Sequence, residues 1–134
     1  MPDFYASDGM RLPAVCVVQP GSPVNVSSGN VANAQAVATI PAVAGKRNYI
    51  TGFEVSGSGA TAGLPVTVTV TGLDNTLSYT YSAAAGVLVA NQPLVVSFPQ
   101  PLPASAVNTA IVVTCPALGS GNTNNTVTAH GFVA

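Results

Sequence analysis

Apolar and polar residues alternate with a period of two along much of the chain. In PVTVTVTGL (65–73) a valine stands at every second position and a threonine at each position between two valines. Successive side chains of a strand point to opposite faces, so this pattern predicts a strand with one buried and one exposed face. LSYTYS (77–82) repeats the pattern, with Leu77, Tyr79 and Tyr81 on the apolar face.

These two runs predict a β-hairpin that turns at residues 74–75, Asp-Asn. Asp and Asn tolerate the left-handed backbone of a tight turn. A two-residue turn there places Val70 opposite Tyr79 and Val68 opposite Tyr81, so that apolar residues face each other across the ladder. Both tyrosines are therefore expected to point inward with the valines.

The same test predicts six further strands, at residues 14–19, 35–40, 47–56, 94–98, 109–115 and 126–133. Clusters rich in Gly, Pro, Ser and Asn, such as QPGSPVNVSSGN (19–30) and FPQPLPAS (98–105), are expected to separate the strands. Around 47–56, period two predicts one face with Tyr49, Thr51, Phe53 and Val55, and another with Lys46, Asn48, Ile50 and Glu54.

The expected fold is all-β: an eight-stranded antiparallel β-sandwich of the jelly-roll type. The 11 prolines and 13 glycines interrupt the chain too often for long helices, and only 104–108 is expected to form one short helical turn. An immunoglobulin-like sandwich is the alternative, although the chain has no Trp to form the core pattern of that fold.

The first residues form a separate unit in this interpretation. Residues 1–13 are expected to be an N-terminal arm and 14–134 a single sandwich domain. Apolar side chains in an arm without a strand pattern pack either on their own domain or on a neighbour, and aromatic residues are favoured anchors of interfaces. The candidate interface residues are Phe4 and Tyr5, together with the only three basic residues, Arg11, Lys46 and Arg47.

Charge is the most unusual feature of the composition. Only 5% of the 134 residues are charged, against about 25% in ordinary domains. Three basic residues and a net charge of −1 do not suit nucleic-acid binding. The apolar runs are far shorter than the roughly 20 residues of a membrane-spanning helix. The composition thus favours a globular domain with a neutral surface that resists association weakly.

The N-terminus has acidic residues where a secretory signal needs basic ones, so synthesis without export is expected. Cys16 and Cys115 lie in the apolar runs VCVV and IVVTC. They are interpreted as small buried hydrophobic residues, with a disulfide between them left open.

No motif for catalysis or metal binding is found. His130 has no G-x-S-x-G or other nucleophile motif to accompany it and is expected on a sheet surface. Glu54 and Asp74 would be the carboxylate pair of a glycosidase, but Asp74 is explained by the turn. Cys16, Cys115 and His130 lack the close spacing of a zinc site. GSGATAG (57–63) lacks the ending of a phosphate loop, and is interpreted as a connection whose small residues let another backbone approach closely. The expectation is no enzyme, no cofactor and no metal.

Three segments carry a resemblance to a known family: AGKRNYITGFEVSGSGATAG (44–63), PLVVSFPQPLPAS (93–105) and NTAIVVTCPALGSGNTNNTVTAHGFVA (108–134). They resemble the jelly-roll cement, or decoration, proteins of tailed bacteriophages, over about residues 34–134. The likeness lies in the composition of these segments and in their order along the chain.

This resemblance implies a structural virion protein that is assembled in the host cytoplasm and coats the outer capsid surface. Such a protein forms homo-oligomers (dimers or trimers) and stabilises the shell by bridging neighbouring major capsid subunits, without binding nucleic acid or membrane. The alternative is a carbohydrate- or receptor-binding sandwich module of a phage fibre or surface protein, with Tyr49, Tyr79 and Tyr81 available for stacking. A secreted or surface β-domain of bacterial origin is a third interpretation.

Overall fold

A computed structural model describes residues 21–86 and 91–134. It is all-β, and the described residues contain no helix. The strands are β1 (Ser22–Ser27), β2 (Ala36–Ile40), β3 (Asn48–Ser58), β4 (Ala62–Gly63), β5 (Val66–Thr71), β6 (Leu77–Tyr81), β7 (Leu94–Pro103), β8 (Ile111–Cys115), β9 (Gly119–Ser120) and β10 (Asn124–Val133). The expected arm (1–13), the expected strand at 14–19 and Cys16 lie outside the described residues.

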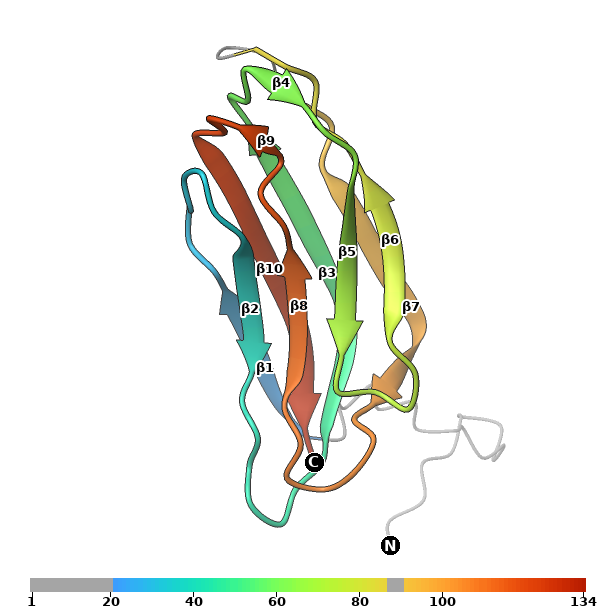
Figure 1. Ribbon diagram of the computed structural model, residues 1–134. Coiled ribbons are helices and arrows are strands. Elements are labelled where there is room, and N and C mark those ends of the chain that lie inside the picture. The colour runs from blue at the N-terminus through green and yellow to red at the C-terminus, as the bar shows by residue number, and fades with distance from the viewer. Residues whose placement is uncertain (1–20, 87–90) are drawn as a thin grey trace, which may run out of the picture.

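Two four-stranded antiparallel sheets lie face to face (Figure 1). One sheet has the order β1-β10-β3-β7 and the other the order β2-β8-β5-β6. The two-residue strands β4 and β9 pair at one end of the molecule. An all-β, sandwich-like fold is therefore confirmed.

The strand pairs are nested along the chain. β5 pairs with β6, β3 with β7, β2 with β8, and β1 with β10. Each pair encloses the one before it, as if a single long hairpin centred on the β5–β6 turn had been rolled into two layers. β10 also pairs with β3 and β5 with β8, which completes the two sheets.

The core lies between the sheets and is filled by the inward positions of the alternating strands. Phe53 is fully buried there, edge-on to Tyr79 at a centroid distance of 5.4 Å and tilted against Phe98 at 6.3 Å. Such aromatic contacts add to the stabilisation from burial alone. The other large, fully buried apolar residues are Ile40, Ile50, Val55, Val68, Val70, Ile111, Val113, Leu118 and Val127.

The predicted hairpin is confirmed, but its predicted register is wrong by two residues. Val68 lies opposite Tyr79 and Val66 opposite Tyr81, because the last pair of the ladder is Val70 and Leu77, which leaves six residues (71–76) between the paired residues instead of two. In this loop Gly72 has a φ of 91°, and its carbonyl accepts a hydrogen bond from Ser105 N at 2.8 Å. A shift by two keeps the faces, so both tyrosines still point inward as predicted.

The predicted faces of β3 are wrong at its beginning. The ladder with β10 shifts between Ile50 and Gly52, whose partners Gly131 and His130 are adjacent, so Thr51 is the extra residue of a β-bulge. The ladder with β7 is irregular at the same place, where residues 98–101 of β7 have no partner in β3. Before the bulge Asn48 and Ile50 are buried; after it Phe53 and Val55 are buried. Tyr49 therefore points outward and stacks on Phe132, with ring centroids 4.8 Å apart.

The prediction that the Pro- and Gly-rich clusters form only loops is wrong. SPVNVS forms β1, and β7 continues through Pro99, Pro101 and Pro103. Both are the outermost strands of their sheet, where a proline removes no ladder hydrogen bond. The short helical turn expected at 104–108 is also absent: those described residues form bends and turns, and Asn108 has a φ of 57°.

The GSGATAG segment is more than a plain connection, because it ends in β4. A Cβ atom on Gly57 would collide with the Asn124 carbonyl oxygen, and one on Gly63 with the Ala83 carbonyl oxygen. The expectation that its small residues allow close approach is confirmed, and the approaching backbone belongs to the same chain.

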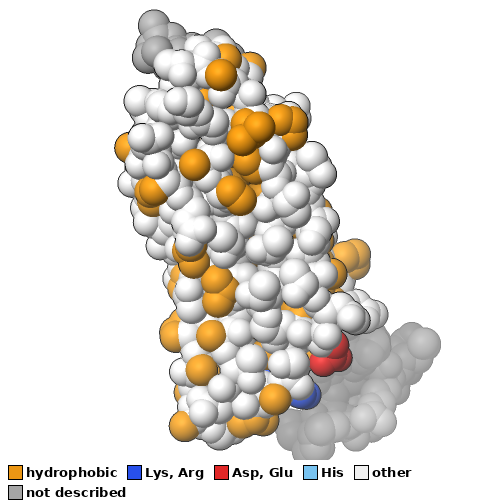
Figure 2. Space-filling view, viewed as in Figure 1, with side chains coloured by type: hydrophobic (Ala, Val, Ile, Leu, Met, Phe, Trp, Pro, Cys, Tyr) orange, Lys and Arg blue, Asp and Glu red, His pale blue; other side chains and the backbone are white. Residues whose placement is uncertain are grey.

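Charge is sparse on the described surface. Of the seven charged residues, the described part contains Lys46, Arg47, Glu54 and Asp74. Figure 2, which looks onto the β2-β8-β5-β6 side, is almost entirely white and orange, with one small red and one small blue area near one end.

Candidate functional site

The described outer face of sheet β1-β10-β3 carries a continuous set of polar side chains. Strands β10 and β3 alternate apolar residues toward the core with polar residues toward solvent. We call this set the polar track: Asn25, Ser27, Glu54, Ser56, Thr126, Thr128 and His130.

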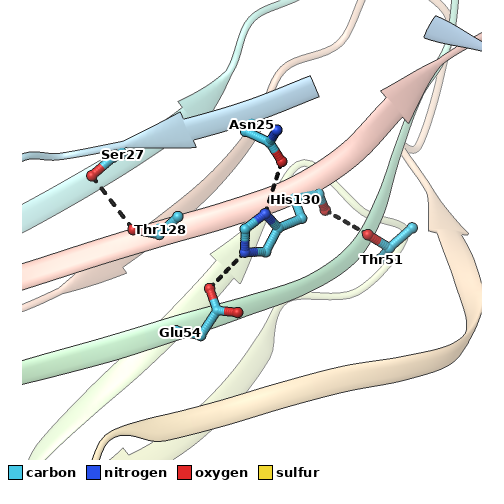
Figure 3. Close-up of polar contacts among 6 residues, drawn as sticks. All are labelled: Asn25, Ser27, Thr51, Glu54, Thr128 and His130. Carbon is cyan, nitrogen blue, oxygen red and sulfur yellow. Dashed lines mark hydrogen bonds and ion pairs between the residues drawn. The ribbon is translucent and has the colours of Figure 1, made fainter. Parts of the chain in front are cut away.

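His130 is the centre of the polar track (Figure 3). It lies opposite Asn25 on β1, and its Nδ1 is 2.8 Å from Asn25 Oδ1. On the other side it lies opposite Gly52, which has no side chain, so the ring reaches along β3 to Glu54. Its Nε2 is 2.7 Å from Glu54 Oε2. The expectation that His130 lies on a sheet surface is confirmed, since its side chain is 40% exposed.

Both ring nitrogens of His130 are engaged, which limits the chemistry of this cluster. An imidazole with two protons donates to both oxygens; with one proton, the Asn25 amide must turn its nitrogen toward Nδ1. The neighbouring hydroxyls bond elsewhere: Thr51 donates to the His130 carbonyl at 3.1 Å, and Thr128 to Ser27 at 3.4 Å. No ring nitrogen is therefore positioned to activate a hydroxyl as a nucleophile.

Glu54 and Asp74 are not brought together as a carboxylate pair. Glu54 is on β3 and bonds His130, whereas Asp74 lies in the β5–β6 loop on the edge of the other sheet. Among the described residues, no group of three or more His, Cys, Asp or Glu side chains is arranged to hold a metal ion.

Cys115 is fully buried, as its apolar setting predicted. Burial raises the pKa of its thiol from an ordinary 9.0 to about 11, while a hydrogen bond with the Asn125 side chain acts in the opposite direction. Burial also raises the pKa of Tyr81, and the nearby Cys115 adds to that shift. A thiol in this state is a poor nucleophile.

The candidate interface residues are only partly described. Phe4, Tyr5 and Arg11 lie outside the described residues. Lys46 is exposed just before β3, and the adjacent Arg47 is half-buried, with Nη2 donating to the Ser105 carbonyl at 3.1 Å. Arg47 is thus partly committed to its own chain, and neither residue faces a described carboxylate within ion-pair distance.

Sequence reasoning missed one contact on this surface and two buried asparagines. The pairing of His130 with Asn25 joins residues 105 positions apart, and only the order of the strands reveals it. Asn48 and Asn125 were not identified as buried. The Asn48 amide donates to the carbonyls of Pro41 and Thr109, each at 2.9 Å, and so fixes two loops.

No helix in the described residues is long and apolar enough to cross a membrane. Comparison of the chain with protein-family models, with curated proteins and with solved structures gave no match. The resemblance to phage decoration proteins therefore stays a prediction.

Proposed function

We propose that this chain is a structural virion protein that coats the outer surface of a phage capsid and stabilises it by bridging neighbouring major capsid subunits. It would act as a homo-oligomer, without catalysis. The observation that carries the proposal is an uncharged outer face on sheet β2-β8-β5-β6.

This surface, the hydroxyl face, consists of small hydroxyl and branched apolar side chains. Its rows follow from the register: Thr67 lies opposite Thr80, and Thr69 lies between Ser78 and Thr114. Its members are Val37, Thr39, Thr67, Thr69, Thr71, Ser78, Thr80, Val112 and Thr114.

Such a face suits contacts that are repeated over a lattice. Burying a charge without a partner is costly, whereas a threonine brings a methyl group and a hydroxyl that finds a partner easily. Each contact would be weak, but symmetry and several neighbours make the total binding strong. The same sheet ends in β2 and β6, whose outward ladder edges carry neither charge nor proline to block pairing.

The finer fold assignment is part of the proposal: an eight-stranded jelly roll, if the two-residue strands β4 and β9 are left aside. The nested pairing of β1–β10, β2–β8, β3–β7 and β5–β6 supports a hairpin rolled into two Greek keys. An immunoglobulin-like sandwich places sequential strands side by side in its first sheet, but no neighbours in β1-β10-β3-β7 are sequential.

A fibre-tip module that stacks sugars on tyrosines is less well supported. Tyr79 and Tyr81 face the core, and Tyr81 is 7% exposed. Tyr49 is stacked on Phe132. Tyr79 and Tyr81 therefore present no open flat face of the kind that sugar stacking requires, and Phe132 covers one face of Tyr49.

The test is binding of the purified protein to empty mature heads of the source phage, read by co-sedimentation and by the melting temperature of the heads. The full chain should bind and raise the melting temperature. Thr69→Lys, which puts a charge in the middle of the hydroxyl face, should abolish both effects.

The matched control is Ser97→Lys, which adds the same charge to an exposed position on the outer side of β7, in the other sheet. It should bind like the unchanged chain. Failure of the full chain to bind would refute the proposed function, and equal binding by the two lysine variants would refute the choice of face.

A further inference from the structure

A polar hollow lies where the polar track reaches the end of the molecule at which β4 and β9 pair. It has a volume of about 430 Å³, within the range of small-ligand sites. The described lining comes from four separate segments of the chain: Asn30, Ser56, Gly57, Ser58, Asn91, Asn124 and Thr126.

The three amides of the hollow are fixed in place by hydrogen bonds. Asn30 Nδ2 donates to Asn124 Oδ1 at 3.0 Å, and Asn124 Nδ2 donates to Ser58 Oγ at 3.0 Å. Asn91 Nδ2 donates to the Gly57 carbonyl at 3.0 Å, and its oxygen accepts from Ala84 N at 2.9 Å. Because the network is formed without a ligand, a ligand would lose little affinity to ordering of the site.

Hydrogen-bonding capacity remains toward the hollow. Ser56 and Thr126 lie opposite each other on β3 and β10, and neither hydroxyl bonds another described residue. Ser58 Oγ accepts from Asn124, so its own O–H is available to donate. Each amide oxygen has a second lone pair. The hollow thus offers donors and acceptors close together at fixed positions.

We propose that this hollow binds a neutral saccharide. The described lining has no basic residue to neutralise a phosphate or carboxylate and no acidic residue to hold a cation. It has too little apolar surface for a hydrophobic ligand. A pyranose carries several hydroxyls, each both donor and acceptor, and matches amide and hydroxyl groups without a charge. This proposal does not depend on capsid decoration, and it uses none of the tyrosines.

The experiment is a titration of the nitrogen-labelled full chain, followed by amide NMR signals. The probes are glucose, galactose, mannose, N-acetylglucosamine and their disaccharides, with sialic acid as the charged comparison. At least one neutral sugar should shift the signals of residues 56–58 and 124–126 in a saturable way. Sialic acid should not.

The test variant is Ser56→Ala combined with Thr126→Val, which removes two hydroxyls without adding bulk. Binding should weaken about tenfold or more, because each lost hydrogen bond to a ligand contributes severalfold. Ser97→Ala, an exposed hydroxyl on β7 outside the hollow, should leave binding unchanged. Circular dichroism checks that each variant remains folded.

Three results would overturn the proposal: no saturable shift with any neutral sugar, a response to sialic acid alone, or equal affinity in the double variant and the unchanged chain. Loss of binding in both Ser97→Ala and the double variant would also count against this location.

Discussion

At the scale of single residues, buried asparagines hold the ends of the strands to the loops. Asn48 is 1% exposed and donates to two loop carbonyls, those of Pro41 and Thr109. Asn125 is fully buried and donates to the carbonyls of Ala34, Cys115 and Pro116 at 3.2 to 3.4 Å. An amide nitrogen suits these positions because it can donate two hydrogen bonds without carrying a charge.

Asn48→Asp should therefore destabilise the fold strongly. It replaces the donating nitrogen by an oxygen that faces two carbonyls, and it buries a carboxylate without a partner. The expected loss is about 3 kcal/mol in the free energy of unfolding, measured with urea. Asn108→Asp makes the same chemical change at an exposed site and should cost less than about 0.5 kcal/mol. Similar losses in both variants would contradict the role given to Asn48.

The Cys115 thiol should make stability fall in alkaline solution. Its pKa is raised from 9.0 to about 11 in the folded chain, so above pH 9 the unfolded chain loses a proton that the folded chain keeps. The contribution of this thiol to the free energy of unfolding is fully present below pH 9 and is lost by about pH 11. The free energy of unfolding should fall by about 1–3 kcal/mol over this range. Tyr81 acts in the same direction, because burial raises its pKa too.

The measurement is urea unfolding between pH 8 and pH 11 in a Cys16→Ser background, with and without Cys115→Ala. The slope of stability against pH should be shallower when Cys115 is replaced. Identical slopes would show that the thiol ionises equally in the folded and unfolded chains.

At the scale of elements, the bulge in β3 decides which side chains face the core. Thr51 is the extra residue, and Gly131 lies opposite Ile50, beside the shift. A Cβ atom on Gly131 would collide with the Tyr49 carbonyl oxygen, which is backbone and cannot move aside. The bulge and Gly131 therefore depend on each other.

Gly131→Ala should destabilise the chain by about 3 kcal/mol because the paired backbones must separate. Gly29→Ala is the matched control: Gly29 has open space around it but a φ of 65°, so only the left-handed backbone is penalised, by about 1 kcal/mol. Thermal unfolding of the two variants checks that Gly131→Ala is the more destabilising change. A smaller effect at Gly131 would mean that the ladder adjusts easily there.

The bulge also shows which parts of the fold can be predicted from sequence. Alternation identified β2, β3, β5, β6, β8 and β10, since each has a buried and an exposed face. An alternation with a period of two does not reveal one inserted residue. The inward and outward faces of β3 before Thr51 were therefore predicted the wrong way round. The register of the β5–β6 hairpin failed for a similar reason, because Leu73 packs on the core and lengthens the loop.

Of the two described strands that contain proline, β1 was missed and β7 was predicted only for residues 94–98, because the tolerance of proline depends on position in the sheet. Pro99 and Pro101 are acceptable because β7 lies at an edge and because residues 98–101 have no partner in β3, and neither feature is visible in a local pattern. Prediction of the site was limited in the same way, because it also depends on strand order. His130 was expected on a surface, but Asn25 and Glu54 become its partners only through the order β1-β10-β3.

At the scale of the whole molecule, the two outer faces differ in chemistry while both are poor in charge. The hydroxyl face has small side chains in regular rows, and the opposite sheet has the polar track with its Glu54–His130 pair. In the proposed arrangement the hydroxyl face lies on the shell and the hollow points away from it. The two proposals are compatible but independent.

Binding to heads should then be almost independent of salt. Interactions between exposed charges weaken as ionic strength rises, but a contact made by threonine and valine has no such charges. Raising sodium chloride about tenfold, from low to moderate ionic strength, should change the dissociation constant less than about twofold. A weakening of more than tenfold would indicate that Lys46, Arg47 or Arg11 dominates the contact instead.

The most direct test of the central claim is the number of copies of this protein in purified virions, by quantitative mass spectrometry against the major capsid subunit. A lattice-binding structural protein should be present at a copy number comparable to that subunit. A handful of copies per particle, or none, would contradict the account.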